Sequence, residues 1–92
     1  MVPRIYLDHN ATAPLLPEAR AAMAPYLADE FGNASSLHAW GRAARAAVEA
    51  ARAQIAGALR CAPDEVVFTG GGTEADNLAV LGAVGAARAD RR

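Results

Sequence analysis

The sequence predicts an α/β fold, in which a mostly helical chain carries an extended N-terminal arm and one strand. Apolar residues recur at intervals of three and four over residues 39–60, which is the period of one helical face. A β-branched run covers residues 65–69, and a helix is predicted over 73–88, after three glycines. A strand that leads through a glycine turn into a helix is typical of α/β proteins.

The 92 residues suit a thin core that is short of bulky side chains. The hydrophobic fraction is 53%, but alanine supplies about half of it and aromatic residues are only 5%, so burial per residue is low. One strand also cannot satisfy its own backbone, and only the apolar run 5–7 offers another candidate. We therefore expect residues 1–92 to be a single incomplete segment whose neighbours come from further chain or another subunit.

The first 16 residues are predicted to form an extended N-terminal arm. The apolar run 5–7 lies between Pro3 and the polar sequence that begins at Asp8, and such a pattern indicates an extended stretch followed by a turn. The Asp8 side chain is expected to cap that turn.

Two helices separated by a loop should follow the arm. The first is predicted over 17–30, because Pro17 is favoured at the first helical position, and Pro25 should kink it or end it early. A polar loop over 31–38 leads to the long helix over 39–60. The opposite face of that helix carries charged residues that could pair with one another and should be solvated, namely Arg45, Glu49 and Arg52.

The glycines after the predicted strand indicate an anion site. Glycines permit positive φ and remove the Cβ atoms that would hold a ligand away, and a helix that begins at Thr73 has free N–H groups pointing back toward the loop. Residues 70–73 are therefore predicted to be a phosphate loop. Two simpler readings stay open, since Thr73 and Asp76 could form a weak capping box and a glycine run can be only a turn.

Charge and composition argue against several classes of function. The formal net charge is −1 and the arginines form no evident cluster, so we expect neither a nucleic-acid partner nor binding to a membrane surface. No apolar stretch approaches the roughly 18 residues of a membrane span, and no signal-peptide core follows Met1, so a cytoplasmic protein is expected.

His9 and His38 lack a ligand pattern, so no metal site is expected. Cys61, the only cysteine, should be a partly buried apolar residue, not a nucleophile.

Three motifs carry a resemblance to a known enzyme family. They are Tyr6 to Pro14, Phe31 to His38 with the following Gly41-Arg42, and Glu65 to Asn77. In this order and spacing they resemble the N-terminal part of cysteine desulfurases, which are pyridoxal-phosphate enzymes of the class V aminotransferase type. The resemblance covers nearly all of this chain and about the first quarter of the family. It implies the N-terminal part of an aminotransferase-like large domain of fold type I.

The resemblance also implies roles for particular residues. In the family the pair at the end of the glycine loop binds the cofactor phosphate, and the matching positions are Gly72, through its N–H, and Thr73, through its hydroxyl and N–H. Four further positions match segments near the substrate side or the dimer interface, namely Asn10, Ala11, Asn33 and His38.

The implied activity is removal of sulfur from L-cysteine, leaving L-alanine and an enzyme-bound persulfide. The implied partners are L-cysteine, a sulfur-acceptor protein of iron–sulfur cluster assembly or tRNA thiolation, and a second copy in a homodimer. The chain has no lysine to form a Schiff base with the cofactor, and the family's catalytic cysteine and ring-stacking histidine lie beyond its last residue. We therefore expect no catalytic residue in this chain, and no activity from it alone.

Other readings remain open on the sequence. A related class V aminotransferase or a selenocysteine lyase would share these motifs. A stand-alone phosphate-binding module is a further alternative, although the chain lacks the lysine of a Walker motif and the GxGxxG spacing. An alanine-rich helical interaction module that has lost its enzymatic role is the last.

Overall fold

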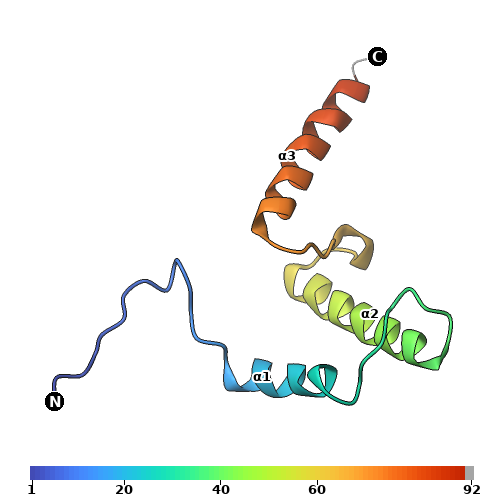
Figure 1. Cartoon of the computed structure of the whole chain (residues 1–92). Coiled ribbons are helices and arrows are strands. Elements are labelled where there is room, and N and C mark those ends of the chain that lie inside the picture. The colour runs from blue at the N-terminus through green and yellow to red at the C-terminus, as the bar shows by residue number, and fades with distance from the viewer. Residues whose placement is uncertain (91–92) are drawn as a thin grey trace. The chain divides into compact units, whose positions relative to one another are not determined.

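The computed structural model describes residues 1–90 and contains three α-helices and two short 3-10 helices (Figure 1). The chain divides into two compact units, the first ending at Ala50 and the second beginning at Ala51, so the division falls inside the long helix. Among residues 1–90 no helix is both long and apolar enough to cross a membrane.

The N-terminal arm is irregular and contains one closed turn. The N–H groups of Ala11 and Thr12 both donate to the carbonyl of Asp8, at 3.0 and 3.3 Å. The hydroxyl of Tyr6 donates to the same carbonyl at 2.9 Å and to the carbonyl of Thr12 at 3.0 Å. The Asp8 side chain was expected to cap this turn, and that prediction was wrong, because the backbone carbonyl of Asp8 is the acceptor and the Tyr6 hydroxyl closes the loop.

The first helix is shorter than the predicted range 17–30. Helix α1 covers Pro17–Met23 and continues as the 3-10 helix η1 over Ala24–Leu27. Pro25 explains the change, since proline has no N–H to donate and its ring clashes with the preceding turn of an α-helix. The carbonyl of Pro25 instead accepts the N–H groups of Ala28 and Glu30, which closes the end of η1.

Helix α2 covers Ala39–Leu59, where the sequence predicted a helix over 39–60. At its start the N–H of Gly41 donates to Nδ1 of His38 at 3.1 Å, so His38 caps the helix. Gly41 is buried, and a Cβ on it would overlap the carbonyl of Ser36, so the loop over 31–38 packs against the first turn only because this residue is glycine.

Helix α2 ends in a Schellman motif. The N–H of Cys61 donates to the carbonyl of Ala56 at 3.0 Å, and that of Arg60 to Gly57 at 3.3 Å. Arg60 has φ 57°, the left-handed conformation that glycine usually provides in this motif. Ala56, at 2% exposure, is the buried hydrophobic residue of the described chain.

The predicted strand over 65–69 does not form. Glu65 belongs to the 3-10 helix η2, Pro63–Glu65, and no strand occurs within residues 1–90. Val66 has the extended angles φ −99° and ψ 121°, but a strand also requires a neighbour for its ladder, and the described chain supplies none. The segment 66–69 has no regular structure, and a bend at residues 70 and 71 leads into α3, which covers Gly72–Ala89.

Candidate functional site

The start of helix α3 leaves four consecutive backbone N–H groups without an acceptor. Gly71 is the N-cap, and the first hydrogen bond of the helix runs from the N–H of Ala75 to the carbonyl of Gly71 at 3.1 Å. Within the described chain no hydrogen bond is donated by the N–H of Gly71, Gly72, Thr73 or Glu74. Unpaired amides at a helix N-terminus are suited to binding an anion.

The glycine loop is uncovered at Gly71 and Gly72. A Cβ atom added to Gly71 or Gly72 would meet no atom within 4 Å, and residues 70–74 are exposed. The glycines do not use the positive φ that they permit, since no glycine of the described chain has it and Gly71 is fully extended at φ 173°. Their contribution is the absence of side chains in front of the amides.

The first turn of α3 is capped by Glu74. Its Oε2 accepts the N–H of Gly70 at 3.0 Å. The capping box of Thr73 and Asp76, which was left open as an alternative to an anion site, does not form. The helix begins one residue earlier than expected, at Gly72, and places Glu74 at its third position. The sequence signal for this contact is an acidic residue three positions after Gly71.

Two further side chains fix the backbone around the loop. The hydroxyl of Thr69 donates to the carbonyl of Gly71 at 3.1 Å, and the side-chain amide of Asn77 donates to the carbonyl of Thr73 at 2.8 Å. The hydroxyl of Thr73 takes part in no hydrogen bond of the described chain, so it is available to a ligand.

Arg52 supports the segment that leads into the loop. Its guanidinium donates from Nη1 to the carbonyl of Val66, and its Cζ lies 5.0 Å from the centroid of the Phe68 ring, within the range of a cation–π interaction. The sequence had placed Arg52 on a solvated helical face, whereas the structure shows it half-buried. Helical periodicity does not reveal a contact to a segment 14 residues away.

The other predicted site residues lie in the first unit and have roles within the backbone there. Asn33 accepts the N–H of Ser35 on Oδ1 at 2.8 Å and that of Ser36 on its carbonyl at 2.9 Å. His38 caps α2 as described above, and its ring lies 6.0 Å from that of Trp40. Asn10 and Ala11 lie in the turn of the arm, and no hydrogen bond or ring contact of the described chain joins them to Asn33 or His38.

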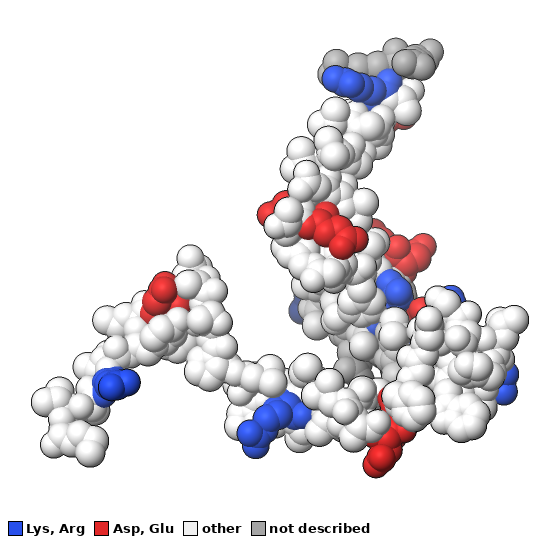
Figure 2. Space-filling model, viewed as in Figure 1, with Lys and Arg blue, Asp and Glu red and all other residues white. Residues whose placement is uncertain are grey.

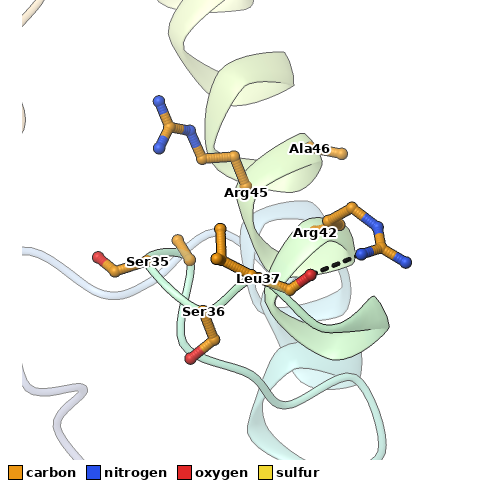
Figure 3. Close-up of a pocket in the computed structure, with 7 residues that line it drawn as sticks. Ser35, Ser36, Leu37, Arg42, Arg45 and Ala46 are labelled. Carbon is orange, nitrogen blue, oxygen red and sulfur yellow. Dashed lines mark hydrogen bonds between the residues drawn. The ribbon is translucent and has the colours of Figure 1, made fainter.

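A shallow hollow of about 380 Å³ lies beside the start of α2 (Figure 3). Two arginines of the helix, Arg42 and Arg45, line it, and their guanidinium groups point to opposite sides (Figure 3). Nη1 of Arg42 donates to the carbonyl of Leu37 at 2.6 Å, and Nε of Arg45 lies 3.8 Å from Oε1 of Glu49. Both guanidinium groups are therefore engaged within the chain. The hollow is lined by Ala34, Ser35, Ser36, Leu37, Arg42, Arg45 and Ala46.

Comparison with known proteins identifies relatives over nearly the whole chain. A cysteine desulfurase of Cereibacter sphaeroides is 51% identical over 84 residues, which are 90% of this chain and 22% of that protein. An IscS-like cysteine desulfurase of Mycobacterium tuberculosis is 57% identical over 77 residues, 84% of this chain and 19% of that protein. The cysteine desulfurase IscS of Dictyoglomus turgidum is 50% identical over 78 residues, which are 85% of this chain and 20% of that protein.

The chain spans about a fifth of the length of these curated relatives. No solved structure gives a significant match. The model of one protein family, described as aminotransferase class-V, matches residues 5–92. Because this match covers more than nine-tenths of the sequence and agrees with the three motifs, the chain belongs to the class-V aminotransferase family.

Proposed function

We propose that this chain is the N-terminal part of a pyridoxal-phosphate-dependent cysteine desulfurase, and that Gly72 and Thr73 bind the phosphate of the cofactor. The observation that carries the proposal is the run of unpaired N–H groups from Gly71 to Glu74, beside the open glycine loop. The names of the relatives, which are cysteine desulfurases, support the choice of reaction.

The residues of the loop suit a phosphate group. A phosphate dianion offers several acceptor oxygens, and the loop offers the N–H groups of Gly72 and Thr73 and the Thr73 hydroxyl. Each charge-assisted hydrogen bond contributes about 1.5–3 kcal/mol, and a helix N-terminus adds roughly 0.3–2 kcal/mol. A few such contacts give useful affinity without a basic side chain.

The cofactor, when bound, supplies the electron sink for breaking bonds at the substrate's α-carbon and β-carbon. The residues of this chain hold and orient its phosphate. The chain contains no lysine, so the Schiff-base lysine must lie outside it, and residues 1–92 alone are inactive. Cys61 is half-buried at the end of α2 and is not the persulfide-forming cysteine.

In the complete enzyme the substrate is L-cysteine, and the products are L-alanine and an enzyme persulfide that passes to a sulfur-acceptor protein. The complete enzyme is a cytoplasmic homodimer.

The test uses a chimera in which this chain replaces the matched segment of the Cereibacter sphaeroides relative. The chimera should retain pyridoxal phosphate, seen as the visible absorbance of the bound cofactor, and should form alanine from L-cysteine. Thr73→Val should weaken cofactor binding about tenfold, since one charge-assisted hydrogen bond is lost.

Thr12→Val is the matched control, because it makes the same change in the turn of the arm. Its affinity for the cofactor should equal that of the unsubstituted chimera. Unchanged affinity in Thr73→Val would contradict the role of Thr73, and a chimera without bound cofactor would contradict the proposed function as a whole.

A further inference from the structure

The carboxylate of Glu74 lies at the glycine loop, where an anion is expected to bind. Glu74 is the third residue of α3, the position from which a carboxylate ordinarily reaches back to the N–H of the N-cap. Here the N-cap is Gly71, but Oε2 passes it and accepts the N–H of Gly70, at 3.0 Å. The N–H of Gly71 stays unpaired as a result.

The space at Gly70 permits this contact. A Cβ atom on Gly70 would lie 3.3 Å from Oε2 of Glu74, whereas one on Gly71 or Gly72 would meet nothing within 4 Å. The carboxylate thus covers the first glycine of the loop and leaves the next two uncovered. The Thr69 hydroxyl donates to the carbonyl of Gly71, so side chains hold the loop at two consecutive residues, Gly70 and Gly71.

We propose that Glu74 is a positioning residue, which fixes the glycine loop through Gly70 so that the amides from Gly71 to Thr73 face the cofactor phosphate. The proposal rests on the proposed function and adds a residue to it. By accepting the Gly70 N–H, Glu74 orders the loop, and its carboxylate takes none of the amides that the phosphate needs. The position of the acceptor oxygen is what matters here, and solvent screens the charge of Glu74, which is exposed.

Two substitutions separate the hydrogen bond from the charge. Glu74→Gln retains an acceptor oxygen at the same reach, so cofactor affinity of the chimera should stay within about threefold of its original value. Glu74→Ala removes the acceptor and frees the loop, so affinity should fall about tenfold.

Asp76→Asn is the matched control for charge. Asp76 lies in the same part of α3 and makes no hydrogen bond or ion pair within residues 1–90. Removing its charge should leave affinity unchanged or raise it slightly. The amide proton of Gly70, followed by NMR in the 92-residue chain, should shift in Glu74→Ala and not in Asp76→Asn. Inorganic phosphate, added to the same samples, should perturb the amides of Gly72 and Thr73 less in Glu74→Ala.

Two results would overturn the inference. If Glu74→Ala, Glu74→Gln and Asp76→Asn all bind the cofactor more tightly, Glu74 only repels the phosphate or competes with it for the amides. If Glu74→Gln loses as much affinity as Glu74→Ala, the hydrogen bond to Gly70 does not position the loop. Both results presuppose an unsubstituted chimera that holds the cofactor. A chimera that holds none contradicts the proposed function, and the shift of the Gly70 amide then decides the Glu74 contact separately.

Discussion

At the scale of single residues, the structure shows three residues that set where helices begin or end. His38 caps α2, Glu74 caps the start of α3, and Arg60 ends α2 in the left-handed conformation. For His38 the sequence predicted no metal site and, through the resemblance, a position near the substrate side or the dimer interface. It gave no sign that Arg60 would adopt the conformation usual for glycine, because the motif depends on where the helix stops.

Arg60→Gly should stabilise the chain. A non-glycine residue at φ 57° has a steric cost of about 1 kcal/mol, which glycine relieves, although glycine also gains entropy in the unfolded state. We therefore expect an increase of about 0.5 kcal/mol in the free energy of unfolding, measured by urea denaturation and circular dichroism. Arg60→Ala retains the Cβ atom and should give no increase. An equal gain from both substitutions would show that the arginine side chain, and not the backbone conformation, is responsible.

At the scale of elements, two glycines of α2 illustrate opposite uses of the same residue. Gly41 is buried at the start of the helix, where a Cβ would overlap the carbonyl of Ser36. Gly57 lies near the end, with nothing within 4 Å of its Cβ position. Propensity treats the two positions alike, so only the packing of the loop over 31–38 distinguishes them.

Gly41→Ala and Gly57→Ala should therefore change stability in opposite directions. Gly57→Ala should stabilise the chain by about 0.5–1 kcal/mol through helix propensity. Gly41→Ala should destabilise it by about 1–3 kcal/mol, because the loop must move away from the helix. Thermal unfolding followed by circular dichroism measures both. Stabilisation by Gly41→Ala would mean that the loop does not pack on α2 in solution.

The limits of the two long helices could be predicted from the sequence, whereas the strand predicted over 65–69 is absent from the described residues. Helices α2 and α3 follow local periodicity and end near local signals, so their limits fall within about one residue of those predicted. The run 65–69 has β-branched composition, but strand formation depends on neighbours that the described residues do not provide. The anion site was predicted from local chemistry, whereas the Arg52 contact to Val66 depends on tertiary packing.

At the scale of the whole molecule, the chain exposes much of its apolar surface. On the side in view, α3 carries almost no charged residue between its first and last turns (Figure 2). Leu78, Val80 and Leu81 are exposed by 51%, 62% and 68%. Apolar surface of this kind ordinarily contacts other protein. The sequence predicted that neighbours come from further chain or another subunit, and that remains a prediction for a chain that spans about a fifth of the length of its relatives.

The crystal structure of the chimera with pyridoxal phosphate tests the central claim most directly. We predict phosphate oxygens at hydrogen-bond distance, about 2.7–3.2 Å, from the backbone nitrogens of Gly72 and Thr73, with the Thr73 hydroxyl as a third donor. The carboxylate of Glu74 should remain on the N–H of Gly70. A phosphate held elsewhere, with the amides of Gly72 and Thr73 bonded to protein carbonyls, would contradict the account.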